Sequence, residues 1–180
     1  MSAASIKQEI IKHIGSSYAN YRVPLARKIL KEKIPLKNLF PVLYLEHPIS
    51  TRFSWLLGDI SMIDPSKSKE IIIEGFKNFD RIHILNFDRT IAKQCMICGN
   101  DLPQKLEGEI VDRLFYWLNT PSISIATKYY AMLTLFNLCR KYPDLKNELI
   151  VSIQAQLPHS SKALKNCGNK ILTSLKVDKE

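Results

Sequence analysis

Three prolines, at positions 65, 103 and 143, occupy the same place within three similar stretches of this chain. Counted back from each proline, places 12, 8 and 5 hold an apolar or cysteine side chain in every copy: Phe53, Leu57 and Ile60, then Ile91, Cys95 and Cys98, then Ala131, Leu135 and Leu138. Counted forward, places 7, 8 and 14 hold Ile72, Ile73 and Phe79, then Ile110, Val111 and Trp117, then Ile150, Val151 and Leu157. Each set has the spacing of one helix face. The pattern therefore predicts three pairs of amphipathic helices, each pair joined at a proline.

Proline suits such a joint for steric reasons. It disfavours helical backbone in the residue before it, and it is tolerated in the first turn of the next helix, where its missing N–H loses no bond. Asp64 and Asp144 lie next to two of the joints, where an Asp side chain can bond the backbone of a turn or a helix start. The 38 and 40 residues between successive prolines are typical of helical-pair repeats.

The rest of the chain extends this pattern at both ends. "YRVPLARKIL" (21–30) predicts a helix whose partner is "PLKNLFPVLYL" (35–45), with Pro35 at the joint, and "SSKALKNCGNKILTSL" (160–175) predicts a last, unpaired helix. Only residues 79–88 are too irregular to assign. We expect an all-α fold, a right-handed α-α superhelix of about four helical pairs plus a terminal helix, in a single repeat domain over residues 1–180.

Composition and charge limit the cellular setting. The chain is 46% apolar and 24% charged, its first residues show no apolar signal region, and no stretch approaches the roughly 18 apolar residues of a membrane span. We therefore expect a cytoplasmic protein with no membrane partner, whose four sparse cysteines are reduced. The net charge of +9 belongs to the ends: residues 1–40 hold eight Lys or Arg against two acids, and residues 159–180 hold five against two. These basic ends could attract nucleic acid or an acidic partner.

The chain resembles HEAT-like α-helical repeat proteins over nearly its whole length. More narrowly, "STRFSWLLGDI", "HILNFDRTIAKQCMI", "ATKYYAMLTLFNL" and "KALKNCGNKIL" resemble a group of small bacterial HEAT-like proteins that often carry the label adenylosuccinate lyase. The label implies a lyase with a Ser-Ser-x-Met-Pro-x-Lys-x-Asn loop. The nearest segment here, "SMIDPSKSK" (61–69), lacks the paired serines and the Met-Pro step, and it falls on a predicted joint between helices.

Trp55 and Asp59 form the one candidate catalytic pair. They stand four residues apart, hence on one helix face, away from the Phe53, Leu57 and Ile60 stripe. The pair is similar to the Trp-x-x-x-Asp of HEAT-like bacterial alkylpurine DNA glycosylases, a resemblance that implies a carboxylate and an aromatic wall beside a cationic damaged base. The structural alternative is that Trp55 packs against a neighbouring repeat and Asp59 is solvated.

The chain offers no other catalytic or metal-binding pattern. Cys95 and Cys98 have the CxxC spacing of metal and redox sites, but they occupy slots held by leucine or isoleucine in the sister repeats, so we interpret them as core residues. The scattered histidines, at positions 13, 47, 83 and 159, are interpreted as surface or loop residues, and no Gly-rich phosphate loop occurs. We expect neither a metal nor a cofactor.

These observations favour a non-catalytic scaffold or binding module with a protein partner, since stacked helical pairs leave a curved surface on which a partner can lie. The alternatives are an alkylpurine DNA glycosylase that uses Trp55 and Asp59 and, third, the adenylosuccinate lyase that the label implies.

Replacing both cysteines, Cys95→Ala with Cys98→Ala, tests their role as core residues. We expect the free energy of unfolding to fall by about 1–3 kcal/mol in total through lost packing, as measured by urea denaturation. We also expect the purified protein to contain no stoichiometric zinc. One metal ion per chain that disappears in the double variant would overturn this interpretation.

Overall fold

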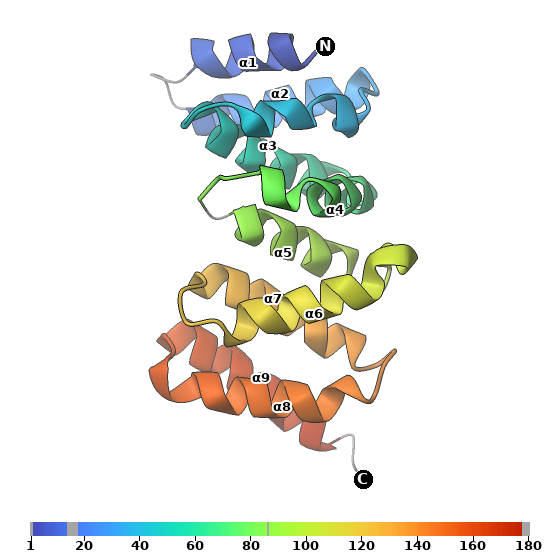
Figure 1. Ribbon diagram of the computed structural model, residues 1–180, viewed down its shortest axis with the longest axis vertical. Coiled ribbons are helices and arrows are strands. Elements are labelled where there is room, and N and C mark those ends of the chain that lie inside the picture. The colour runs from blue at the N-terminus through green and yellow to red at the C-terminus, as the bar shows by residue number, and fades with distance from the viewer. Residues whose placement is uncertain (1, 14–17, 86, 178–180) are drawn as a thin grey trace. The chain divides into compact units, whose positions relative to one another are not determined.

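The computed structural model describes residues 2–13, 18–85 and 87–177 of the chain. Within these ranges every secondary-structure element is an α-helix or a short 3-10 helix (η), and none is a strand (Figure 1). The prediction of an all-α protein is therefore confirmed. In the same ranges, no helix combines the length and the hydrophobicity needed to cross a membrane.

The helices gather into two units, Met1–Cys98 and Gly99–Glu180. The first unit contains α1 (Ala3–Lys12), α2 (Tyr18–Lys31), η1 (Leu36–Asn38), η2 (Phe40–Tyr44), α3 (Ile49–Ile63), α4 (Lys67–Lys77), η3 (Phe79–Arg81) and α5 (Phe87–Cys98). The second contains η4 (Gln104–Leu106), α6 (Glu107–Asn119), α7 (Ile125–Leu138), α8 (Leu145–Gln156), η5 (Leu157–His159) and α9 (Lys162–Val177). The single domain over residues 1–180 stays a prediction.

Each of the three prolines follows one α-helix and precedes another, as predicted. Pro65 lies between α3 and α4, and Pro143 between α7 and α8. Beside Pro65, the Asp64 Oδ1 accepts hydrogen bonds from the Ser66 backbone N–H at 3.1 Å and from its hydroxyl at 2.6 Å, which stabilises the turn. Asp144 makes no capping bond through its side chain.

The apolar stripe before each proline is buried almost completely. Eight of its nine side chains are buried, and only Cys98 is partly exposed. After the proline, the buried places differ between the helices. Helices α4 and α8 begin two residues after their proline and bury places 6 and 10: Ile71 and Gly75, then Leu149 and Ile153.

Helix α6 begins four residues after Pro103, behind the 3-10 turn η4, and buries places 7, 11 and 14: Ile110, Leu114 and Trp117. A 3-10 turn advances about 120° per residue instead of about 100°, so it rotates the helix that follows it. The prediction that place 8 is buried is wrong for Val151, which is 65% exposed.

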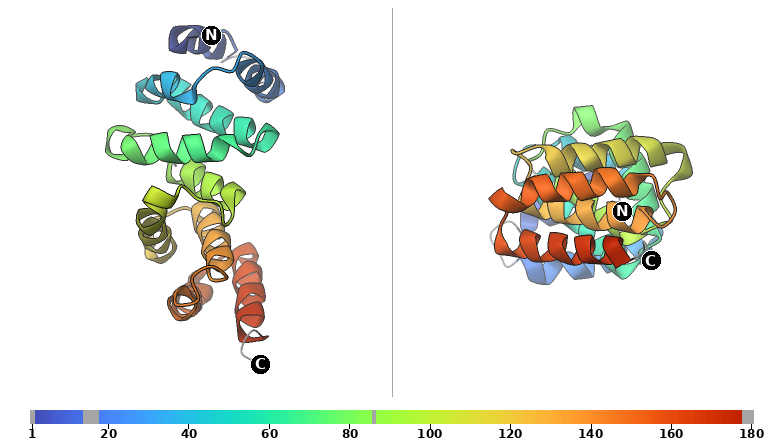
Figure 2. Two further views of the ribbon diagram at one scale, coloured as in Figure 1. Left: turned by 90° about the vertical axis from the view of Figure 1, so that its right-hand side faces the viewer. Right: turned by 90° about the horizontal axis from the view of Figure 1, so that it is seen from below.

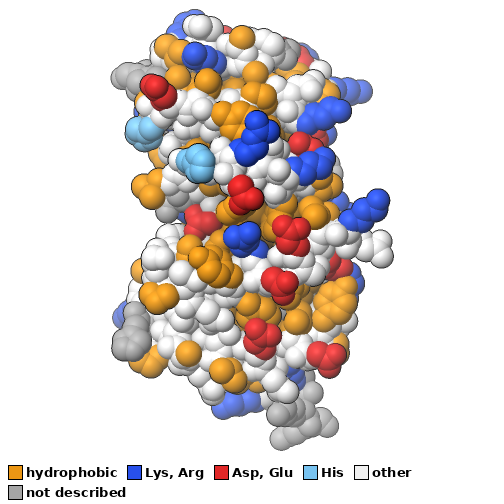
Figure 3. Space-filling model, in the orientation of Figure 1, with side chains coloured by type: hydrophobic (Ala, Val, Ile, Leu, Met, Phe, Trp, Pro, Cys, Tyr) orange, Lys and Arg blue, Asp and Glu red, His pale blue; other side chains and the backbone are white. Residues whose placement is uncertain are grey.

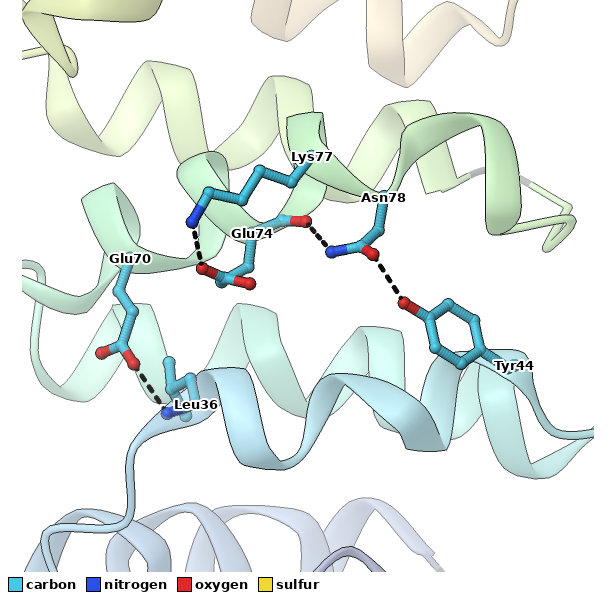
Figure 4. Close-up of polar contacts among 6 residues, drawn as sticks. All are labelled: Leu36, Tyr44, Glu70, Glu74, Lys77 and Asn78. Atoms are coloured by element: carbon cyan, nitrogen blue, oxygen red, sulfur yellow. Dashed lines mark hydrogen bonds and ion pairs between the residues drawn. The ribbon is translucent and has the colours of Figure 1, made fainter.

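Residues 35–45 do not form the predicted second helix of a first pair. They form η1 and η2, because Pro41 lacks a backbone N–H and its ring clashes with the carbonyl one turn earlier. Side chains of α4 and of Asn78, the residue that follows it, hold this segment instead (Figure 4). The Leu36 N–H donates to Glu70 Oε1 at 2.7 Å, and the Tyr44 hydroxyl donates to Asn78 Oδ1 at 2.8 Å.

Helix α1 was not predicted. Its signals are Ser2, whose hydroxyl accepts a hydrogen bond from the Ser5 N–H at 3.2 Å, and the fully buried Ile6 and Ile10 at i, i+4 spacing. Helix α1 packs against α3 and η2. Between α1 and α2, the Tyr21 hydroxyl donates to Glu9, and burial together with this hydrogen bond raises the pKa of Tyr21 to about 12.

The remaining predictions at the level of single elements are confirmed with small changes. Residues 21–30 lie within α2, and residues 162–175 lie within the terminal helix α9. The unassigned residues 79–88 contain η3 and the start of α5, except for residue 86, which lies outside the described ranges.

In the first unit, α3 contacts α1, α2, α4, α5 and η2, so its apolar side chains form much of the core. The buried hydroxyl of Ser61 on α3 donates to the side chain of Gln94 on α5. Helices α4 and α5 also contact each other.

In the second unit, α7 contacts α6, α8 and α9, and α8 contacts α6 and α9 (Figure 2). A polar cluster joins the start of α6 to the turn after α7. The buried Glu107 carboxylate accepts hydrogen bonds from Lys141 Nζ and from the Tyr142 hydroxyl, each at 2.8 Å.

Gly75 marks a close approach of α4 to α5. A Cβ atom at this position would lie 2.4 Å from Ile91 Cδ1 on the buried face of α5. We expect Gly75→Ala to destabilise the protein by about 1 kcal/mol in urea denaturation, because overpacking outweighs the gain in helix propensity.

The variant Ile91→Val removes the clashing Cδ1 atom. In that background we expect Gly75→Ala to be neutral or to stabilise by up to about 1 kcal/mol. Gly108→Ala is the matched control, since a Cβ at Gly108 would meet no atom within 4 Å. An equal effect of Gly75→Ala in both backgrounds would contradict the proposed contact.

Candidate functional site

Trp55 and Asp59 lie on α3 on the face that the core does not use. Trp55 is 50% exposed, whereas Phe53 and Leu57 are fully buried. Met62, which lies one turn beyond Asp59 and seven residues after Trp55 on the same face, is 63% exposed. The sequence prediction that Trp55 points away from the buried stripe is therefore confirmed, and the helix presents an apolar, partly aromatic surface.

Asp59 is held by an ion pair within the first unit. Its side chain is 16% exposed and pairs with the guanidinium of Arg22 on α2, whose Nε contacts Asp59 Oδ2. The solvated carboxylate of the structural alternative therefore does not describe Asp59. Because a partly buried carboxylate is costly without a cation, Arg22 and Asp59 fix each other at the edge of the Trp55 surface.

A second cation reaches the same helix from α5. Lys93 Nζ lies 3.8 Å from the position that a Cβ atom of Gly58 would occupy, so the ammonium group lies beside the backbone of α3. We call the set formed by Trp55, Asp59 and Met62 with Arg22 and Lys93 the α3 face. Its charges are one internally neutralised ion pair and one further ammonium group.

Sequence reasoning found only part of the α3 face. Met62 follows Trp55 at i+7, so helical spacing could have added it to the pair. Arg22 stands 37 residues before Asp59 on another helix, and no spacing rule connects the two. In the sequence, Lys93 is marked only by its place before Pro103, which corresponds to the place of Trp55 before Pro65.

The prediction that the two cysteines of the CxxC segment are core residues is confirmed for Cys95. Cys95 is fully buried, and burial raises the pKa of its thiol above the ordinary value. Cys98 is partly exposed, and all four cysteines are thiols. Among the described residues, no three His, Cys, Asp or Glu side chains lie close enough together to hold a metal ion.

Two of the scattered histidines come together in the first unit. His47 and His83 are exposed, as predicted, and line a hollow of about 520 Å³ with Tyr44 and Arg81. The Arg81 guanidinium lies 5.5 Å from the centre of the Tyr44 ring. His13 is half-buried and stacks on Tyr21, while the side chain of His159 lies outside the described part of the structure.

The segment 61–69, compared above with the lyase loop, is divided between two helices and a turn. Ser61 is buried in α3 and Ser68 is buried in α4, whereas the hydroxyl of Ser66 is bonded to Asp64 in the turn. The segment therefore forms the joint between α3 and α4.

Charge is distributed unevenly within each unit. Helices α1 and α2 carry six Lys or Arg residues and one acid, Glu9. In the second unit, acidic side chains lie over α6 and α8 on the face drawn in Figure 3. The exposed ones include Glu109, Asp112 and Glu148.

Comparison of the chain with protein-family models, with curated proteins and with solved structures gives no match. The resemblance to HEAT-like proteins stays a prediction.

A double-mutant cycle measures how strongly the Arg22–Asp59 pair is coupled. We expect Arg22→Ala, Asp59→Ala and the double variant to give a coupling energy of about 1 kcal/mol in urea denaturation, since both side chains are partly buried. The control cycle uses the Glu74–Lys77 pair at 2.9 Å, whose lysine side chain is 61% exposed. There we expect about 0.3 kcal/mol. A coupling energy at Arg22–Asp59 no larger than that of the control pair would contradict the claim that the ion pair fixes these two side chains.

Proposed function

We propose that this chain is a HEAT-like α-helical repeat protein that acts in the cytoplasm as a non-catalytic scaffold or binding module for a protein partner. The helical pairs around the three prolines support a right-handed α-α superhelix. So does the packing within each unit, where α3 contacts α5 and α7 contacts α9 besides their neighbours in sequence. In such repeats each pair buries its apolar stripes only by stacking, and the outer faces remain for binding.

The observation that carries the proposal is the exposed Trp55 on the α3 face. Tryptophan and arginine are enriched among the residues that dominate protein interfaces, and methionine adapts its shape to a partner. Trp55 and Met62 supply an apolar centre whose side chains are 50% and 63% exposed, and the Arg22–Asp59 pair holds polar groups in a defined orientation beside it.

An alkylpurine DNA glycosylase is the second candidate, favoured by the half-exposed Trp55 one turn from Asp59. Under that proposal Asp59 would stabilise a cationic base, and the basic N- and C-terminal regions would contact phosphates. The ion pair weighs against it, because Arg22 already neutralises the Asp59 carboxylate. A protein-binding surface, by contrast, requires no free carboxylate, so the Arg22–Asp59 ion pair is compatible with it.

Site-specific photocrosslinking in cells tests the binding module. A photoreactive phenylalanine analogue replaces Trp55 or, as the matched control, Tyr116 on α6, which is 55% exposed. We expect one defined protein adduct from position 55 and none from position 116, and we expect Met62→Asp to abolish the adduct by placing a charge in the apolar centre. Equal adducts from both positions, or an adduct that survives Met62→Asp, would contradict a specific interface on α3.

The glycosylase alternative makes a different prediction for the purified protein. It requires release of alkylated purine from damaged duplex DNA and loss of that release in Asp59→Asn. We expect no release. Binding to DNA should be weak, indifferent to damage and steeply reduced by salt, because counterion release would supply the affinity. Base excision that disappears in Asp59→Asn would replace the scaffold proposal with the glycosylase.

A further inference from the structure

The second unit contains a small hollow of about 270 Å³ with one charged residue in its lining, Lys128. Lys128 is only 6% exposed, and the surrounding walls include Ile123, Ile125 and Leu164. Ligand pockets usually have volumes of roughly 300–1,000 Å³, so this hollow suits a molecule of few atoms. The lining also contains the polar residues Gln156 and Ser160, and Ile125 is 53% exposed, so the hollow opens to solvent on that side. A buried amine in such a place is unusual, because lysine is almost never buried without a charged partner.

Lys128 has only a neutral partner in the described part of the chain. Its Nζ donates to Gln156 Oε1 at 2.7 Å, and no acidic side chain lines the hollow. The sequence contains no Asp or Glu in 113–143 or in 149–177, the stretches that supply the lining. Burial lowers the pKa of Lys128, as expected for an ammonium group that has lost water without gaining an anion.

Two helix starts and one helix end meet at the hollow, since α8 ends at Gln156. Lys128 lies in the first turn of α7, whose N-terminal cap is Ser124. Ser160 and Leu164, at the start of α9, line the hollow from the other side. The N-terminal ends of α7 and α9 attract anions, whereas the C-terminal end of α8 attracts cations. The helix ends therefore offset one another in part, and none of them replaces an acidic side chain beside Lys128.

We propose that this hollow binds a small monocarboxylate with a short apolar tail. The carboxylate accepts hydrogen bonds from Lys128 Nζ and supplies the missing counter-charge between the two helix starts. The tail lies against Ile123, Ile125 and Leu164, where it displaces water from apolar walls. The site is separate from the α3 face, and it stands whether or not the scaffold proposal does.

Titration calorimetry of the full chain with pentanoate and with pentanamide tests this site. The two probes have the same tail, but only pentanoate carries the charge. We expect pentanoate to bind at one site per chain and pentanamide to bind about tenfold more weakly or worse, because the charged hydrogen bond to the buried Lys128 is lost. Amide NMR shifts on adding pentanoate should include Lys128, Gln156 and Leu164.

Lys128→Met is the decisive variant, since it keeps an unbranched apolar chain and removes the buried charge. We expect it to fold, with a midpoint of urea unfolding no lower than that of the wild type, and to lose pentanoate binding by about tenfold or more. Lys105→Met, at an exposed lysine of η4 in the same unit, is the control and should bind as the wild type does.

Four results would overturn the proposal. They are the absence of pentanoate binding, equal affinity for pentanamide, unchanged binding by Lys128→Met, and an equal loss in Lys105→Met, which would reveal a general charge effect. Reductive trapping by pentanal and cyanoborohydride at Lys128, in a protein that does not bind pentanoate, would instead indicate a nucleophilic amine.

Discussion

Burial of one apolar stripe per helix is the interaction on which the rest of this structure depends. The described α-helices are 10 to 16 residues long, a length at which isolated helices are marginal in water. Each one is stabilised mainly by packing. Helix α3 shows this most clearly, because Phe53, Leu57 and Ile60 are fully buried while the helix contacts α1, α2, α4 and α5.

The length of the joint at each proline decides which residues of the next helix enter the core. Helices α4 and α8 start two residues after their prolines and both bury places 6 and 10, although α4 also buries Ile72 at place 7. Helix α6 starts behind η4 and buries places 7, 11 and 14. A small residue then decides how closely two helices approach. At Gly75 the gap to Ile91 has no room for a methyl group, so the backbone of α4 lies against α5.

The candidate sites occur where side chains depart from the stripe pattern. Trp55 and Met62 are large apolar residues left outside the core, and Lys128 is a charged residue placed inside it. Both arrangements are unfavourable in an isolated protein, because one exposes apolar surface and the other removes an ammonium group from water. A partner that covers α3 would bury the exposed apolar surface, and an anion beside Lys128 would neutralise the buried ammonium group.

The sequence by itself determined the three helical pairs around Pro65, Pro103 and Pro143, because helical periodicity and proline sterics act over a few neighbouring residues. It therefore predicted the buried face of α3, the orientation of Trp55 away from that face and the burial of Cys95. Only the tertiary structure decided that Arg22 pairs with Asp59 and that Lys128 lies in a hollow beside the start of α9. Such contacts join residues far apart in sequence. They depend on how helices rotate and cross, which the spacing of apolar residues within one helix does not specify.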